Sequence, residues 1–139
     1  MRLSQQLGQW AEQHAEQYLQ QQGFTLVLRN FHSRFGEIDL IVEKDHELIF
    51  VEVKARQPTQ WGSACEVITL AKQRKIMHTA LLFLQQSPQY EPYAVRFDVI
   101  CIDFLQPIAK IPQQGFSIRD YDLAWIENAF TFDANLIRL

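Results

Sequence analysis

One stretch of the chain, residues 37–54, limits the folds that the rest of the sequence can adopt. It consists of two runs rich in β-branched and other apolar residues, joined by the short polar segment 44–47. This pattern predicts an antiparallel hairpin with its turn centred between Asp45 and His46. Charged residues nevertheless stand at the open end of both strands, where a buried hairpin would carry apolar ones.

The predicted turn fixes the register of the two strands. It places Asp39 opposite Glu52, and Glu37 opposite Lys54. Because side chains alternate between the two faces of a strand, one face is predicted to be apolar throughout and to carry Ile38, Leu40, Val42, Ile49, Val51 and Val53. The other face carries Ile41, Leu48 and Phe50 near the turn and the four charged residues at the open end.

The pairing of Asp39 with Glu52 predicts a cation site. Directly opposed residues have Cβ atoms about 4.5–5.5 Å apart, and like charges at that separation destabilise a sheet. Mg²⁺ or Mn²⁺ held by two carboxylates, water and a substrate phosphate would relieve the repulsion. Lys54 lies on the same face, where it would position or deprotonate a water and offset phosphate charge. The pattern therefore indicates metal-dependent phosphodiester hydrolysis.

A simpler interpretation of these charges stays open. Acidic and basic residues are common on the solvent face of a sheet, and Glu37 with Lys54 would then be a cross-strand ion pair of small energy. Glu37 in particular fits a structural role as readily as a functional one.

Composition predicts a single folded domain over residues 1–139. The 47% hydrophobic and 12% aromatic content excludes a disordered chain. The formal charge of −3 argues mildly against a nucleic-acid partner, but a metal site itself requires acids. Two groups of cationic residues favour phosphate contacts or simply a solvated surface: Arg29, His32, Arg34, Lys54 and Arg56 near the hairpin, and Lys72, Arg74 and Lys75 after it.

The two cysteines, Cys65 and Cys101, lack the spacing of a disulfide framework or a zinc site. The N-terminal stretch is rich in Gln and has no apolar core of a signal peptide, and no run approaches the roughly 20 apolar residues of a membrane span. We therefore expect a reduced, cytoplasmic protein that does not contact a membrane.

The first helix is predicted from Leu3 to about Gln22, with Gly23 as its stop, because apolar residues recur there at helical spacing. Glu12 lies beside the apolar stripe and Glu16 farther out, so Glu12 is the favoured third acid of the site. A solvated helix glutamate explains Glu12 equally well. His14, the remaining polar member of the stripe, is expected to be a half-buried packing residue.

Further elements follow from the same patterns. We expect a strand over 24–30, a loop over 31–36 that carries Arg34, and a loop over 57–65 in which Trp61 stacks on a base or anchors the loop. A helix over 67–86 is expected to bury Val67, Leu70, Ala71, Met77, Ala80, Leu81 and Leu84, with Lys72 and Lys75 away from that face.

The C-terminal third is predicted to contain a strand over 93–104, an edge strand over 116–120 and a short helix over 121–130. Because hairpin, helix and strand form a crossover unit, the strand over 93–104 should lie parallel to the one that carries Glu52. The sequence thus predicts an α/β fold with a central mixed β-sheet flanked by helices.

Asp39, a spacer, and Glu52-Val53-Lys54, preceded by a helix bearing Glu12, resemble the motif of the restriction-endonuclease-like nucleases of the PD-(D/E)xK type. In those proteins the acids bind the divalent metal and the lysine assists the attacking water. The residue before Asp39 is isoleucine, whereas the name of the motif has proline there. That proline does not bind the metal.

A longer set of motifs resembles the YraN family of small bacterial proteins. It comprises Gly8, Glu12, Gly23-Phe24, Arg29-Asn30, Gly36-Glu37-Ile38-Asp39, Phe50-Val51-Glu52-Val53-Lys54-Ala55-Arg56, Trp61-Gly62, Lys72, Arg96-Phe97-Asp98-Val99 and Glu127-Asn128-Ala129-Phe130. The resemblance implies a bacterial protein with a fold similar to that of archaeal Holliday-junction resolvases, but it implies no activity by itself.

Together the residues and the resemblance predict a DNA endonuclease with Mg²⁺ or Mn²⁺ at Glu12, Asp39 and Glu52, and with Lys54 acting on the water. Arg34, Arg56 and Lys72 are the expected nucleic-acid contacts, whereas the role of Glu37 is not fixed. Branched or single-stranded DNA is the expected substrate, and a homodimer follows from the likeness to resolvases. The competing hypothesis is a nucleic-acid-binding or protein-interaction module without catalysis.

Overall fold

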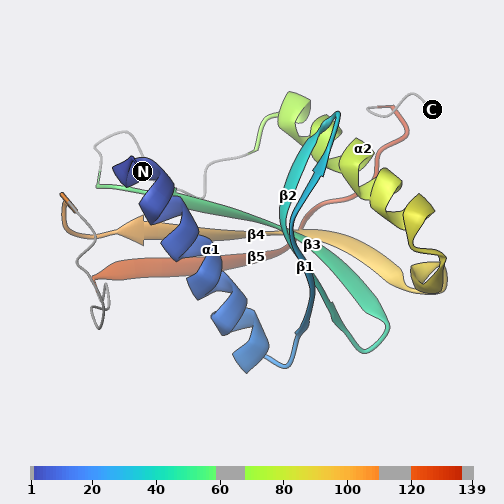
Figure 1. Ribbon diagram of the computed structural model, residues 1–139, viewed down its shortest axis with the longest axis horizontal. Coiled ribbons are helices and arrows are strands. Elements are labelled where there is room, and N and C mark those ends of the chain that lie inside the picture. The colour runs from blue at the N-terminus through green and yellow to red at the C-terminus, as the bar shows by residue number, and fades with distance from the viewer. Residues whose placement is uncertain (1, 59–67, 110–119, 136–139) are drawn as a thin grey trace.

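The computed structural model describes residues 2–58, 68–109 and 120–135. One five-stranded sheet lies between two helices, α1 and α2 (Figure 1). In chain order the elements are α1 (Leu3–Gln21), β1 (Thr25–Ser33), β2 (Gly36–Lys44), β3 (Glu47–Arg56), α2 (Leu70–Gln86), the 3₁₀ turn η1 (Pro88–Tyr90), β4 (Ala94–Phe104) and β5 (Tyr121–Phe130). This architecture confirms the α/β prediction and is consistent with a restriction-endonuclease-like fold.

The strands lie in the sheet in their chain order, from β1 at one edge to β5 at the other. β3 and β4 are parallel, as predicted for the two strands on either side of α2, and the other three pairs are antiparallel. The sheet is therefore mixed, with a parallel pair that adjoins antiparallel strands on both sides.

Two apolar clusters hold the helices to opposite faces of the sheet. Under α1, Leu7, Ala11, Ala15 and Leu19 pack with a set from the strands that includes Leu40, Val42, Ile49, Val51, Ile100 and Ile102. Under α2, Ile76, Met77, Ala80 and Phe83 pack with Ile38, Ile41, Leu48, Phe50 and Phe97. Both faces of β2 and β3 are thus buried near their turn, which explains the apolar runs in these strands.

The predicted face of one hairpin residue is wrong. Ile38 was expected beside Leu40 and Val42, but it joins the cluster under α2 with Ile41. The alternation of side chains between the two faces therefore breaks at Asp39. The pairing of β2 with β3 covers Leu40 to Lys44 and does not include Asp39. This irregularity is a feature of the candidate site described below.

The N-terminal elements agree with the sequence apart from the length of β1. α1 ends one residue before its predicted limit, and Gly23 has the positive φ of 95° that suits a helix stop. β1 continues to Ser33, so the expected loop over 31–36 shrinks to a turn at Arg34 and Phe35. Phe31 accounts for the extension, since its ring packs against Phe83 of α2.

The buried face of α2 differs from the predicted one. Thr69 caps the helix by accepting the backbone N–H of Lys72, whereas residues 59–67, including Trp61 and Val67, lie outside the described residues. Leu70 and Ala71 are exposed, against expectation, and Ile76, Thr79 and Phe83 are buried in addition to Met77 and Ala80. The packed stripe is centred on residues 76–83, so the first turn does not reach the core.

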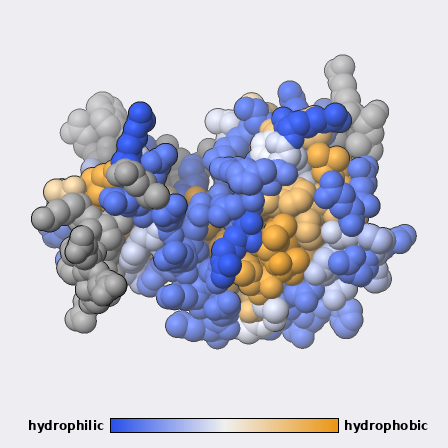
Figure 2. All heavy atoms as spheres, viewed as in Figure 1, coloured by the Kyte–Doolittle hydropathy of each residue, from blue (hydrophilic) through white to orange (hydrophobic). Residues whose placement is uncertain are grey.

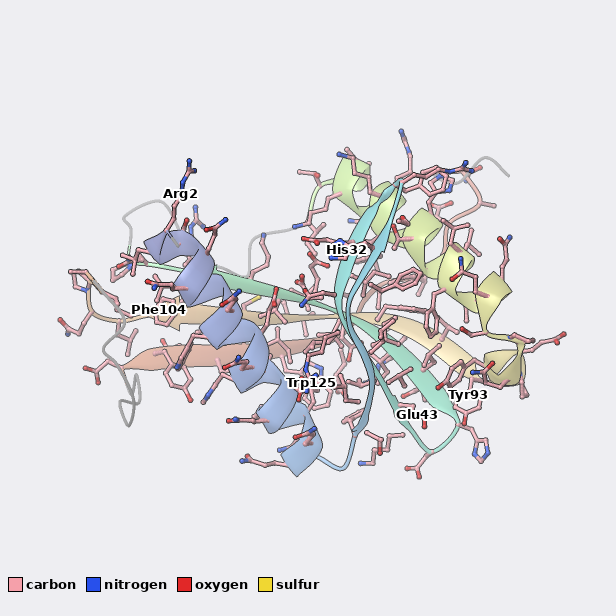
Figure 3. The ribbon with its side chains drawn as sticks, viewed as in Figure 1. Arg2, His32, Glu43, Tyr93, Phe104 and Trp125 are labelled. Carbon is pink, nitrogen blue, oxygen red and sulfur yellow. The ribbon has the colours of Figure 1, made fainter. Side chains whose placement is uncertain are left out.

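The predicted helix over 121–130 is wrong, because this segment is strand β5, antiparallel to β4. Tyr121, Leu123 and Trp125 alternate with exposed residues and pack on the cluster under α1, and the exposed edge of β4 gains hydrogen-bond partners. Trp125 lies behind the C-terminal half of α1 (Figure 3) and its ring contacts Tyr18 and Phe24. The edge strand expected over 116–120 lies outside the described residues except for Asp120.

The remaining features of the fold are an apolar surface patch, a disulfide-bonded cysteine and the hydrophobicity of the helices. An apolar patch lies over β1 and the adjoining part of α2 (Figure 2), and Leu28 of β1 is 40% exposed. Cys101 on β4 is buried and disulfide-bonded, so the expectation of a reduced protein is wrong, while Cys65 lies outside the described residues. No helix in the described part of the chain is long and apolar enough to span a membrane.

Candidate functional site

The candidate site forms where β2 and β3 separate. From Lys44 and Glu47 at the turn to Leu40 and Val51, the two strands pair in the predicted register. Beyond that point β2 runs with β1 toward the first half of α2, whereas β3 continues along β4 (Figure 1). The separation forms a fork, and Asp39 is the first residue of β2 beyond the last pair.

At the fork, the side chain of Asp39 makes a hydrogen bond to β3 in place of the backbone bonds that end at Leu40. Its Oδ2 accepts the backbone N–H of Val53 at 2.8 Å. Asp39 and Glu52 are 6% and 7% exposed, and burial together with the carboxylate of Asp39 raises the pKa of Glu52. The interaction between the two carboxylates supports the sequence prediction that these acids meet, although the strand pairing stops one residue short of them.

The second predicted pair does not form. Glu37 lies opposite His32 of β1 in the register, and its Oε2 is 3.2 Å from His32 Nδ1. Since β2 has left β3 by this point, Glu37 does not face Lys54. Glu37 is also exposed, unlike the acids of the fork.

Glu12 of α1 joins the acidic pair through Asp39. Burial and the charge of Asp39 raise the pKa of the Glu12 carboxyl, and the side chain of Asn30 of β1 lowers it. Glu12, Asp39 and Glu52 are called the acidic site from here on. Each lies on a different element, so only the folded chain brings them together.

Burial and mutual repulsion disfavour the charged forms of these acids. Burial and, after it, the charge of Asp39 raise the pKa of Glu52 to about 8, against the opposing effect of Lys72. Burial also raises the pKa of Asp39, although the N–H of Val53 counteracts it. For Glu12, burial and the charge of Asp39 raise the pKa to about 7. Perturbed acids gathered in this way are typical of functional sites.

Lys72 is the cation that contacts this site. Its Nζ on α2 lies 3.3 Å from Glu52 Oε1, and the lysine side chain is 49% exposed. Glu52 Oε2, by contrast, is buried without a hydrogen-bond partner. Lys54 is half-buried on the same strand, but the charge that most favours ionised Asp39 and Glu52 is that of Lys72.

The donor set of the acidic site suits a hard divalent cation, since it offers three carboxylates and one of their oxygens is buried without a partner. In the described parts of the chain, however, no group of three or more His, Cys, Asp and Glu is arranged to hold a metal ion. The side chains therefore fit such an ion by chemistry, and they would have to reorient to contact it together.

The three expected nucleic-acid contacts separate into two places. Arg34 lies exposed in the turn between β1 and β2, on the side of α2 that carries Lys72. Arg56 ends β3, four residues beyond Glu52, where it lines a groove with Leu3 and Gly8 of α1. At about 3.3 Å per residue, this distance along the strand is roughly 13 Å.

Sequence reasoning missed Asn30 and misplaced Glu16. Asn30 has a positive φ of 50°, which asparagine tolerates better than most residues, and its side chain counteracts the burial that raises the pKa of Glu12. Glu16 was expected farther out than Glu12, but it is 9% exposed and its Oε2 accepts Arg29 Nη2 at 2.9 Å. His14 is half-buried and stacks on Trp10, as expected of a packing residue.

Comparisons with known proteins show the family to which this chain belongs. The model of the uncharacterised protein family UPF0102 matches residues 11–102, a stretch that contains all three acids of the site and Lys72. A UPF0102 protein of Acinetobacter baumannii strain AYE is 59% identical over 133 residues, which cover 96% of this chain and 100% of the relative.

More distant relatives carry the same name. A UPF0102 protein of Syntrophomonas wolfei is 42% identical over 100 residues, which cover 72% of this chain and 86% of the relative. One of Vibrio parahaemolyticus is 40% identical over 126 residues, with 91% and 93% covered. The chain therefore belongs to the UPF0102 family, the family that its YraN-like motifs indicated.

Proposed function

We propose that the protein is a metal-dependent endonuclease that hydrolyses phosphodiester bonds of DNA. One observation carries this proposal: Glu52 is buried next to Asp39 with one carboxylate oxygen unpartnered. Placing two acids so close in a buried site opposes folding, and a divalent cation would remove both the repulsion and the unpartnered oxygen. A purely structural site would be served better by neutral side chains.

In this proposal Glu12, Asp39 and Glu52 would hold Mg²⁺ or Mn²⁺. When bound, such an ion supplies a water of lowered pKa and stabilises charge on a phosphate. Two lysines beside the acidic site, Lys54 and Lys72, would assist the reaction. Lys54 would orient or deprotonate the attacking water, and the half-exposed ammonium of Lys72 would offset charge that develops on the phosphate oxygens.

The proposal includes membership of the PD-(D/E)xK superfamily and a likeness to archaeal junction resolvases. The fork in the sheet and the helix acid Glu12 support it, because both accompany the Asp39 and Glu52-Val53-Lys54 motif. Branched DNA is then the proposed substrate and the cytoplasm the proposed location. A homodimer would match the paired strands of a junction.

A second candidate function is a nucleic-acid-binding module without catalysis. The arrangement of the acids favours it, since the described residues contain no preformed group of three metal ligands. Such a module would bind DNA in a salt-dependent manner and leave it intact.

Cleavage of labelled branched, single-stranded and duplex DNA separates the two functions. The reactions would contain Mg²⁺ or Mn²⁺, or EDTA as a control, and would include the isosteric variants Asp39→Asn and Glu52→Gln. Glu37→Gln is the matched control, because Glu37 is an acid of the same strand that lies outside the acidic site.

We expect wild-type cleavage that requires metal, falls at least about 100-fold in Asp39→Asn and Glu52→Gln, and changes little in Glu37→Gln. Folded wild-type protein that binds DNA but cuts none of the three substrates would establish the binding module instead. Cleavage that persists in Glu52→Gln would place the chemistry elsewhere in the molecule.

A further inference from the structure

The two helices that cover the sheet carry opposite charges. α1 contains Glu12 and Glu16 and neither Lys nor Arg. α2 contains Lys72, Arg74 and Lys75 and neither Asp nor Glu, although the whole chain has a formal charge of −3. A polyanion that approaches the acidic site would therefore be attracted to the α2 side and repelled from the α1 side.

Three other cationic side chains of the described residues are occupied by protein acceptors. Arg29 pairs with Glu16, Arg96 with Glu47, Asp98 and Glu127, and Lys44 donates to the carbonyl of Gln22. By contrast, Arg74 and Lys75 are exposed, and neither forms an ion pair with any described residue. Their charges are thus available to an external anion.

The turn between β1 and β2 brings a further cationic residue, Arg34, beside this helix. Ser33 Oγ lies 2.9 Å from Thr79 Oγ1, and the rings of Phe35 and His78 stack with centroids 4.8 Å apart. The guanidinium of Arg34 lies 4.9 Å from the centre of the Phe35 ring. These contacts hold the turn against α2, and Arg34 lies near the ring that stacks on His78 of the helix.

The close fit continues at Gly36. A Cβ added there would lie 3.6 Å from the Cβ of Lys75, so the backbone of the turn passes directly beside this lysine. Hydrophilic side chains cover the tip of the β1–β2 hairpin (Figure 2), which lies beside the first half of α2 (Figure 1). Arg34, Lys72, Arg74, Lys75 and His78 are called the α2 surface from here on.

The α2 surface leads away from the acidic site. Lys72 contacts Glu52 at the inner end of this surface, and Lys75 lies three residues farther along the helix, about 4.5 Å along the axis. The cationic residues of the surface therefore continue outward from the fork without an intervening acid on the helix. A phosphate chain with one phosphate in the fork could follow them.

We infer that the α2 surface binds the phosphate backbone of the DNA strand that enters the acidic site, with Arg74, Lys75 and Arg34 as phosphate contacts. Arginine and lysine recognise phosphates by charge-assisted hydrogen bonds, and contacts of this kind carry no sequence information. The inference rests on the proposed function for the nature of the ligand, but it does not require hydrolysis. It assigns contacts to Arg74 and Lys75 and places Arg56 outside the surface.

Fluorescence anisotropy with labelled single-stranded and duplex DNA tests this inference on the full chain, in EDTA and again with Ca²⁺. The variant is Arg74→Gln/Lys75→Gln, which removes two positive charges. Gln13→Glu/Gln20→Glu is the matched control, since it changes the net charge equally at exposed positions of α1.

We expect the α2 variant to bind at least about tenfold more weakly at low salt, and its plot of log affinity against log salt to lose roughly two in slope on duplex DNA. The α1 control should stay within about twofold of wild type. Equal losses in both variants, or no loss in the α2 variant, would overturn the inference. So would a wild-type protein that binds neither DNA in either condition.

Failure of this inference is distinct from failure of the proposed function. If wild-type protein cuts DNA and the α2 variant binds normally, the endonuclease stands and the backbone lies elsewhere. If wild-type protein binds through α2 but cuts nothing, the surface stands and hydrolysis does not.

Discussion

Lys72 Nζ on α2 lies 3.3 Å from Oε1 of Glu52 on β3, while Oε2 of the same carboxylate is buried without a partner. The lysine thus partly compensates a charge that burial and Asp39 disfavour. Because Lys72 is half-exposed and Glu52 is not, only the lysine can swing toward an entering phosphate without exposing the core. The pair links the acidic site to the surface proposed for DNA.

Replacing Lys72 tests how much this pair stabilises the metal-free protein. We expect Lys72→Met to lower the free energy of unfolding by about 1 kcal/mol at pH 9, where Glu52 is ionised, and much less at pH 6, where it is protonated. Urea denaturation in EDTA at both pH values measures the difference. Lys72→Arg keeps the charge and should resemble wild type. An equal loss at both pH values would show that Lys72 acts through packing.

The raised pKa values predict how the metal-free protein responds to pH. The pKa of Glu52 rises from an ordinary 4.5 to about 8 on folding, and that of Glu12 to about 7. Between about pH 4.5 and pH 8 the folded state therefore binds more protons than the unfolded state. Their effect on stability is therefore most favourable below pH 4.5 and is lost as the pH rises to 8.

Glu52→Gln isolates this effect. A neutral amide cannot ionise, so we expect the variant to be more stable than wild type at pH 8.5 and to show a flatter decline between pH 6 and 8.5. Urea denaturation in EDTA provides the measurement. Glu37→Gln should decline nearly as wild type does, because Glu37 is exposed and its charge is only a lesser cause of the raised pKa values of Glu12 and Asp39. A wild-type stability that increases over this range would contradict the assignment.

Metal binding should release protons. At pH 7 the pKa of Glu52 is about 8 and that of Glu12 about 7, so a cation that takes both carboxylates must displace at least about one proton. Calorimetric titration with Mn²⁺ in buffers of different ionisation enthalpy counts these protons. We expect the count to approach zero at pH 9 and the affinity to fall below pH 7. Binding that survives in Asp39→Asn with an unchanged proton count would exclude this site.

The hairpin was the part of the fold that the sequence specified best. Its register follows from one turn, and Asp45 and His46 adopt the positive φ values that such a turn requires. The contact of Asp39 with Glu52 could be predicted because both follow from that register. The fork could not, since it depends on where β2 leaves β3 to follow β1, and no local pattern encodes that point.

Other features depended on tertiary packing. The prediction of a helix over 121–130 failed because the edge of β4 and the cluster under α1 decide the conformation of that segment. Lys72 was assigned to phosphates from its helical position, but its contact with Glu52 arises from the placement of α2 across the sheet. Asn30 gave only a weak signal, an asparagine at the end of an apolar run.

Asp98 of β4 provides a test of how β5 is held to the sheet. Its buried carboxylate accepts Arg96 in a bidentate contact, the indole N–H of Trp125 at 2.9 Å and the backbone N–H of Asn128 at 2.8 Å. Asp98→Ala leaves the N–H groups of Trp125 and Asn128 without this acceptor and removes the buried partner of Arg96, and we expect a loss of about 3–5 kcal/mol in the free energy of unfolding.

The control for this prediction is the variant Asp98→Asn. Arg96, the charged partner of Asp98, is only partly buried and also contacts Glu47 and Glu127. Asp98→Asn retains an acceptor for Trp125 but not the charge for Arg96, and it should lose less than Asp98→Ala. Chemical denaturation followed by tryptophan fluorescence measures both losses, and hydrogen exchange shows whether the amides of β5 open first. If Asp98→Ala unfolds at the wild-type midpoint, the contacts on β5 are not what holds this strand, and apolar packing of Leu123 and Trp125 under α1 suffices.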